Sequence, residues 1–297
     1  MYRFSELIFD TYDSKLFELY QGMDNLDWVW KQLYLVNLKE LENVEKSTIK
    51  ELQNKAQRGM QIANISDKKE LSQKWVNYMF SRETEALFIY LYSLQENFLK
   101  EHLVIENKKI FKKIQRENVI FVSPHWGAFY SLPLILSALD FEVYPVANGD
   151  ESDHLERIFD TLEKPHKKNV NVILSTKYPV RLLKEMNYYL KNGKNILVYP
   201  EYTFGKEPKY ETTYLGIKFP TARGVASISR SQRVNIQPVS LRRIPGTSKF
   251  ELKFYDTIST KKDVISINKT LHSTIDKIVR QDLSQWWYWE IFEKNMK

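Results

Sequence analysis

Short β-branched or apolar runs alternate with helical stretches in the second part of the chain, and this alternation limits the fold more than any other feature. We interpret as strands the runs at residues 119–123, 142–147, 171–175, 195–199, 235–241 and 250–255. Helical candidates lie between and after them, at about residues 128–140, 152–163, 179–192, 221–232, 263–282 and 285–294. Such alternation is typical of a largely parallel sheet covered by helices. We therefore expect an α/β fold with a central, largely parallel sheet.

The first part of the chain has a different pattern. From Trp28 to about Lys100, apolar residues recur near the helical period of 3.6, with charged residues between them. We expect this N-terminal helical part, residues 1–117, to pack against an α/β core of residues 118–297. The sequence has no internal repeat, low-complexity tract or linker, so we expect one compact unit. With 297 residues, 43% of them hydrophobic, the chain can bury such a core.

The composition excludes several classes of site. The chain has no cysteine, which excludes disulfides, thiolate metal ligands and a cysteine nucleophile. Its five histidines show no paired ligand spacing, so we expect no metal site. The longest apolar runs are far shorter than the roughly 20 residues that span a bilayer, and the N-terminus does not resemble a secretory signal. We expect a cytoplasmic protein that can dock peripherally at the inner face of the membrane.

The net charge favours an anionic partner. Lysine and arginine total 44 against 37 acidic residues, a formal net charge of +7. Anionic membrane headgroups, an acidic carrier protein, coenzyme phosphates and nucleic acid all fit such an excess. We expect no nucleic-acid binding, because no motif and no interleaved aromatic and basic array supports it.

His125 is the strongest candidate for chemistry. It lies just past the strand candidate at residues 119–123, and Gly127 follows it in a tight turn. Open α/β sheets bind ligands beyond the carboxyl ends of their strands, where an imidazole that titrates near neutrality can act as a general base. A glycine turn there would let a substrate approach the backbone closely. The alternative is a buried histidine that only hydrogen-bonds within its turn.

Four further segments lie where the active edge of such a sheet is expected. Taken singly, each segment could be an ordinary turn in which proline and glycine follow a strand. The first segment has Arg181 at the start of a helix, and the second has Glu201, Thr203 and Gly205 at the exit of a strand. The third is a loop that leads into a helix and contains Gly216 and Arg223. The fourth is a strand that ends with Arg242 and Arg243. The exposed N–H groups of the helix near Arg223 could hold a phosphate or a carbonyl oxygen.

Together with His125, the order and spacing of these segments resemble the lysophospholipid acyltransferase superfamily. Within it they are most similar to the branch of lipid A late acyltransferases and mycobacterial mannoside acyltransferases. The run from Ser284 to Glu290 resembles the Gln-Trp-containing helix that closes members of that branch, so the resemblance covers roughly residues 30–295.

The resemblance implies a transferase of lipid biosynthesis. A fatty acyl group moves from a thioester donor, acyl-CoA or acyl carrier protein, to a hydroxyl or amine of a lipid, glycolipid or small-metabolite acceptor. The phosphopantetheine of the donor is then part of a co-substrate, and no cofactor is bound permanently.

The resemblance also implies roles for single residues. His125 takes the proton from the attacking hydroxyl or amine, and a carboxylate orients the imidazole. In the family an Asp or Glu follows the histidine by five positions, where this chain has Tyr130. A phenol can orient an imidazole by a hydrogen bond but carries no full charge at neutral pH. We expect Glu201 as the first substitute carboxylate and Asp150 as the second.

The family implies phosphate contacts for arginines, whose planar donors suit such groups. The expected substrate-binding set is Arg181, Thr203, Gly205, Gly216 and Arg223. The tyrosine at position 130 leaves an alternative, a catalytically degenerate member that keeps the fold to bind lipid or a partner protein. A C-terminal tryptophan cluster fits either a membrane interface or core packing, and consists of Trp286, Trp287 and Trp289.

Overall fold

A computed structural model describes residues 20, 22–93, 95–148, 173–175, 179–201 and 210–293 of the chain. The described strands are β1 (Leu103–Glu106), β2 (Val119–Val122), β3 (Val143–Asn148), β4 (Ile173–Ser175), β5 (Asn195–Val198), β6 (Tyr210–Tyr214), β7 (Ile217–Thr221), β8 (Asn235–Arg243) and β9 (Phe250–Phe254). Seven of them form one sheet in the order β1-β9-β8-β2-β5-β3-β4. Its pairings are parallel except that of β8 with β9. The expected α/β fold with a largely parallel sheet is confirmed.

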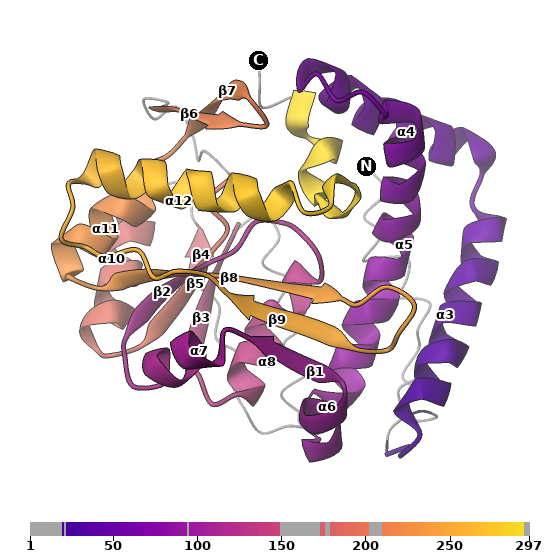
Figure 1. Cartoon of the computed structure of the whole chain (residues 1–297), viewed down its shortest axis with the longest axis horizontal. Helices are drawn as coiled ribbons and strands as arrows, with labels where there is room; N and C mark the ends of the chain where they lie inside the picture. The colour runs from indigo at the N-terminus through magenta and orange to yellow at the C-terminus, as the bar shows by residue number, and fades with distance from the viewer. Residues whose placement is uncertain are drawn as a thin grey trace.

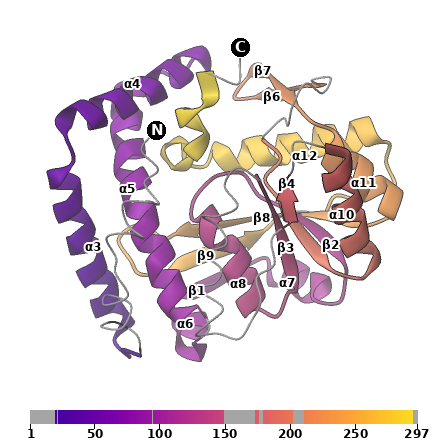
Figure 2. The same ribbon diagram turned by 180° about the vertical axis from the view of Figure 1, so that it is seen from behind.

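Helices cover this sheet and extend beyond it. They are α3 (Leu26–Asn43), α4 (Lys46–Ile62), α5 (Lys68–Tyr92), α6 (Glu96–Glu101), α7 (Lys108–Ile114), α8 (Leu132–Ala138), α10 (Pro179–Lys191), α11 (Gly224–Gln232) and α12 (Val264–Val279), with 3₁₀ turns η1 (Phe129–Ser131), η3 (Leu283–Gln285) and η4 (Trp287–Glu290). The helices α3, α4 and α5 stand at one side of the molecule, and α10 and α11 lie at the opposite side (Figure 1 and Figure 2). The predicted N-terminal helices are therefore present.

The centre of the sheet is buried on both faces. In β2, Val119 and Phe121 pack into the apolar cluster that includes α8, whereas Ile120 and Val122 pack into the cluster that includes α10, α11 and α12. Strands that are apolar on both faces are typical of parallel sheets. The chain leaves β2 toward α8 on one face and leaves β5 toward α11 on the other. Neighbouring strands that diverge in this way mark the position where open α/β sheets bind ligands.

Some elements differ from the sequence-based expectations. Residues 214–221, interpreted as part of a loop, belong to the antiparallel hairpin of β6 and β7. The helix expected at residues 285–294 is wrong, because Trp286 is extended between η3 and η4 and forms a β-bridge with Trp126. Strand β1 was not expected and pairs with β9 at the sheet edge. The helix expected at residues 152–163 lies outside the described residues.

The hairpin turn between β6 and β7 explains one of these differences. Leu215 and Gly216 have φ values of +51° and +86°, so both central residues of the turn are left-handed. Two-residue hairpins need this geometry and usually place Asn-Gly or Asp-Gly there. A leucine in this position is uncommon, so the turn is hard to recognise from sequence.

Strand β8 occupies the space beside Gly127. This glycine has a φ of +62°, and an added Cβ would lie 2.3 Å from the carbonyl oxygen of Leu241. We expected a substrate to approach the backbone closely at Gly127, but a neighbouring strand makes this close approach instead. A backbone atom cannot move aside as a flexible side chain can, so the turn requires glycine.

We expect Gly127→Ala to lower the free energy of unfolding by about 3 kcal/mol, because backbone strain and overlap act together. Gly193→Ala is the matched control. Gly193 also has a positive φ, +74°, but nothing lies within 4 Å of its added Cβ. This control should lose about 1 kcal/mol, since only the backbone strain applies. Urea unfolding curves measure both losses, and equal losses would contradict the role given to Leu241.

His272 on α12 is a fully buried titratable group. Its Nδ1 lies 2.6 Å from the hydroxyl of Tyr214, and burial lowers its pKa from 6.5 to about 3. The folded protein thus keeps this imidazole neutral over a pH range in which the unfolded chain binds a proton. The resulting contribution to stability is complete above pH 6.5 and is lost as the pH falls toward 3.

As the pH falls from 6.5 to about 4, we expect His272 to lower the free energy of unfolding by about 3 kcal/mol. His272→Asn removes the titrating group and leaves an acceptor near the Nδ1 position for Tyr214. Unfolding free energies measured over this pH range should therefore fall less steeply in the variant than in the natural chain. Parallel curves for the two proteins would show that His272 does not set the slope.

Candidate active site

The register of two neighbouring parallel strands brings His125 and Glu201 together. In the pairing of β2 with β5, Val122 lies opposite Val198. His125 follows Val122 by three residues, and Glu201 follows Val198 by three residues. Both therefore emerge at the same edge of the sheet. One carboxylate oxygen of Glu201, Oε2, accepts the backbone N–H of His125 at 2.9 Å and lies 2.5 Å from Nδ1 of the imidazole.

Both members of this pair are buried, with 8% of His125 and 1% of Glu201 exposed. A carboxylate removed from water is costly unless hydrogen-bond donors surround it. Trp286 supplies a further donor, because its indole N–H donates to Oε1 of Glu201 at 2.7 Å. The hydroxyl of Tyr288 donates to the backbone carbonyl of Glu201 at 3.0 Å. These contacts hold the carboxylate in one orientation toward the imidazole.

The C-terminal segment encloses the other side of the site. The backbone N–H of Trp287 donates to the carbonyl of His125 at 2.9 Å, and the N–H of Gly127 donates to the carbonyl of Gln285 at 3.2 Å. Trp286 is fully buried, as is Trp289, so core packing is the correct interpretation for these two tryptophans. Sequence reasoning identified the segment by its Gln-Trp pair but missed Trp286 as a donor to Glu201.

Aromatic rings surround the imidazole. The ring centroids of Tyr199, Phe129 and Trp287 lie 4.7, 4.9 and 5.4 Å from that of His125. The hydroxyl of Tyr199 donates to the carbonyl of Phe129 at 2.7 Å, which fixes two of these rings to each other. An apolar surrounding lowers the local dielectric constant and strengthens the interaction between imidazole and carboxylate.

Tyr130 lies at the surface of this aromatic group, with 46% of the residue exposed. Its ring packs on Phe129, with centroids 4.2 Å apart, and the guanidinium carbon of Arg82 lies 4.6 Å from its centroid. The carboxylate at Nδ1 of His125 comes from Glu201 on the neighbouring strand connection. The acid that the resemblance places at position 130 is thus supplied from another part of the fold.

A family model of bacterial lipid A biosynthesis acyltransferases matches residues 66–291 of the chain. The match covers more than half of the sequence and contains His125, Glu201 and Trp286. The chain belongs to this family. It is therefore an acyltransferase of lipid biosynthesis, and the acyltransferase resemblance is confirmed at this level. A search of curated proteins finds no match.

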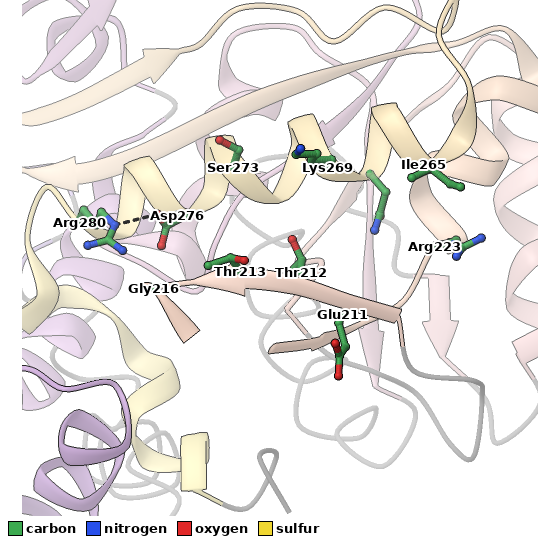
Figure 3. Close-up of a pocket in the computed structure, with 11 residues that line it drawn as sticks. Glu211, Thr212, Thr213, Gly216, Arg223, Ile265, Lys269, Ser273, Asp276 and Arg280 are labelled. Carbon is green, nitrogen blue, oxygen red and sulfur yellow. Dashed lines mark hydrogen bonds and ion pairs between the residues drawn. The ribbon is translucent and has the colours of Figure 1, made fainter. Parts of the chain in front are cut away.

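In this acyltransferase, two of the expected substrate-binding residues line a pocket of about 530 Å³ that does not contain His125 or Glu201. Gly216 and Arg223 lie there with residues of β6, with Lys269 of α12 and with Arg280, which directly follows α12, as Figure 3 shows. Arg280 is paired with Asp276 of α12 at 2.7 Å. Neither residue of the His125 and Glu201 pair lines this pocket. The predicted site residues are therefore divided between the His125–Glu201 pair and the pocket of Arg223.

The remaining predicted site residues are not found at the His125–Glu201 pair or in the pocket of Arg223. Arg181 is exposed on α10, and its guanidinium pairs with Glu185 at 3.1 Å. Thr203, Gly205 and Asp150 lie outside the described residues. Among residues that the structure describes, no group of three or more histidines and carboxylates is placed to hold a metal ion. In the same ranges, no helix combines the length and the apolar character needed to cross a membrane.

Proposed function

We propose that this acyltransferase moves a fatty acyl group from a thioester donor to a hydroxyl or amine, with His125 as the general base. The donor is acyl-CoA or an acyl carrier protein, and the acceptor is a lipid, a glycolipid or a small metabolite. The observation that carries this proposal is the contact of 2.5 Å between Oε2 of Glu201 and Nδ1 of His125. It lies at the carboxyl ends of two adjacent parallel strands, where such sheets bind substrates.

The pair supports direct transfer without an acyl-enzyme intermediate. A carboxylate at Nδ1 keeps the proton on that nitrogen, so Nε2 is the basic one. Nε2 takes the proton from the acceptor as the acceptor oxygen or nitrogen bonds to the thioester carbon. Glu201 stabilises the imidazolium that forms. When the tetrahedral intermediate collapses, the carbon–sulfur bond breaks and the imidazolium returns the proton to the leaving thiolate.

We propose that the phosphates of the donor bind in the pocket of Arg223, whose lining also contains Lys269. This position away from His125 suits a phosphopantetheine arm, because its phosphate lies far from its thioester sulfur. An acidic carrier protein also fits the net charge of +7. The finer kinship with mannoside acyltransferases is part of this proposal, and it rests on the order of the site segments and on the run from Ser284 to Glu290.

A lipid acceptor requires approach to a membrane. We propose peripheral docking at an anionic inner face, which the net charge of +7 supports. Exposed apolar side chains of α3 support it as well, and these are Trp28, Leu35 and Leu38. The degenerate, non-catalytic alternative is less favoured, because a fold that only binds lipid gains nothing from a buried carboxylate held against an imidazole.

Mass spectrometry of reaction products tests this function. The purified chain is incubated with mixed acyl-CoA and acyl carrier protein donors and with lipid and metabolite extracts. We expect a new ester or amide that appears together with free thiol. The His125→Ala protein serves as the control for non-enzymatic transfer. Intact thioesters and no acylated product with any donor would contradict the proposal.

A further inference from the structure

Arg82 is a buried cation beside the proposed active site that the mechanism above leaves unused. It lies on α5, and only 6% of the residue is exposed. Its guanidinium carbon is 4.6 Å from the ring centroid of Tyr130 and 5.9 Å from that of Phe129. Phe129 also packs against His125, with ring centroids 4.9 Å apart. The cation and the proposed base thus contact the same phenyl ring.

The described residues give this guanidinium no acidic partner. Its hydrogen-bond acceptor among them is the sulfur of Met79, 3.6 Å from Nη1, and no described carboxylate lies within ion-pair distance. A thioether sulfur is a weak acceptor, whereas a guanidinium has five N–H donors and is almost never buried without an anion. Most of these donors therefore have no acceptor among the described residues, and the guanidinium lies over the rings of Tyr130 and Phe129.

Two glutamates share the surroundings of Arg82 without forming an ion pair with it. Glu85, one turn further along α5, is engaged by Arg243 at 2.9 Å, and burial raises its pKa. Glu290 lies in η4, and burial raises its pKa as well. Arg82 lowers the pKa of both carboxyl groups, which shows an attraction at a distance, but neither carboxylate lies within ion-pair distance of its guanidinium. A carboxylate in direct contact with Arg82 is therefore absent among the described residues.

We propose that Arg82 binds the anionic group of the acyl acceptor, a carboxylate or a phosphate on the same molecule as the attacking hydroxyl or amine. This inference rests on the proposed function, because it takes His125 as the base at which the acceptor reacts. The planar guanidinium fork matches both anions in bidentate geometry. Arg82 sets substrate class by this contact, and the exposed ring of Tyr130 covers its outer side.

The donor does not explain this cation equally well. In a phosphopantetheine arm, two amide units and a branched segment separate the phosphate from the thioester sulfur. Arg82 and His125 are separated by one phenyl ring. A carboxylate or phosphate close to the nucleophile of a compact acceptor spans that separation, so the acceptor is the substrate that the geometry favours.

Matched acceptor pairs that differ only in the anion test the proposal. One pair is serine and serinamide, and the other is lysophosphatidic acid and the monoacylglycerol with the same chain. We expect the natural protein to bind the anionic member of one pair about 10- to 100-fold more tightly than its neutral partner. The pair that shows the preference distinguishes a carboxylate acceptor from a phosphate acceptor. Equal affinity for both members of both pairs would overturn the proposal.

Variants connect the preference to Arg82. Arg82→Gln should abolish it and leave affinity for the neutral members unchanged, whereas Arg82→Lys should keep part of it, because lysine retains the charge without the fork. Arg58→Gln is the matched control, since Arg58 is exposed on α4 and pairs with Glu293 at 2.7 Å. Thermal unfolding identifies the folded variants. A preference that survives in folded Arg82→Gln protein would also overturn the proposal.

Binding in the His125→Ala background separates this inference from the proposed function. The anion contact does not need the base, so the preference should persist in that protein. A retained preference in a chain that transfers no acyl group from any donor would count against the proposed function and leave the assignment of Arg82 supported.

Discussion

His125→Ala is expected to lower kcat for acyl transfer by roughly 10²- to 10⁴-fold, the range that a positioned general base contributes. Without the imidazole, the acceptor must lose its proton to water while it attacks the thioester. The aromatic rings that surround the site limit the access of water to that position. The measurement is product formation at saturating donor and acceptor, followed by mass spectrometry.

A second buried histidine provides the control for this variant. His102 lies after α6 and outside the site, and its Nδ1 is 3.0 Å from the hydroxyl of Ser248. We expect His102→Gln to change stability but to leave kcat per folded molecule close to that of the natural chain. A His125→Ala protein that turns over at the natural rate would remove this residue from catalysis.

Glu201→Gln is expected to lower kcat by about 10²- to 10³-fold. Oε2 of Glu201 accepts the backbone N–H of His125 and lies 2.5 Å from its Nδ1, and Oε1 accepts the indole N–H of Trp286. A glutamine offers one acceptor oxygen and one NH₂ group, so at least one of these donors must then face another donor. The imidazolium that forms during transfer also loses its counter-charge.

Glu96→Gln is the matched change for Glu201→Gln, because Glu96 is an exposed helix residue paired with Lys100 at 2.5 Å. Such a surface pair contributes little to stability, so this variant should behave like the natural chain. We expect the KM for the donor to change little in Glu201→Gln, since the loss concerns the proton transfer. Unchanged kcat in folded Glu201→Gln protein would exclude the carboxylate from the mechanism.

Local patterns were sufficient to predict most of the fold. The runs that became β2, β3, β5, β8 and β9 are short, apolar and bounded by turn residues, so their pattern did not depend on distant contacts. The β6-β7 hairpin was not predictable in this way, because Leu215 adopts a left-handed conformation that few leucines adopt. The C-terminal helix was wrong because the long-range bridge of Trp286 to Trp126 overrides the helical spacing.

The sequence was sufficient to predict which residues form the candidate site but not how they contact one another. His125 and Glu201 stand out because each follows an apolar strand, which is a local signal. Their contact depends on β5 lying beside β2 in the sheet, although β3 and β4 come between them in the chain. Arg82 gave no sequence signal, because its position beside Phe129 and Tyr130 is a tertiary contact between α5 and the turn after β2.

Chemical rescue of the His125→Ala protein tests the proton transfer by His125 most directly. Imidazoles of graded basicity are added, and the rate of acyl transfer is measured at each concentration. We expect the rate to rise with imidazole concentration and to follow the basicity of the added compound, because the added base replaces the lost side chain. A His125→Ala rate that equals that of the natural chain, or that stays the same across the whole series of bases, would contradict general-base catalysis at this position.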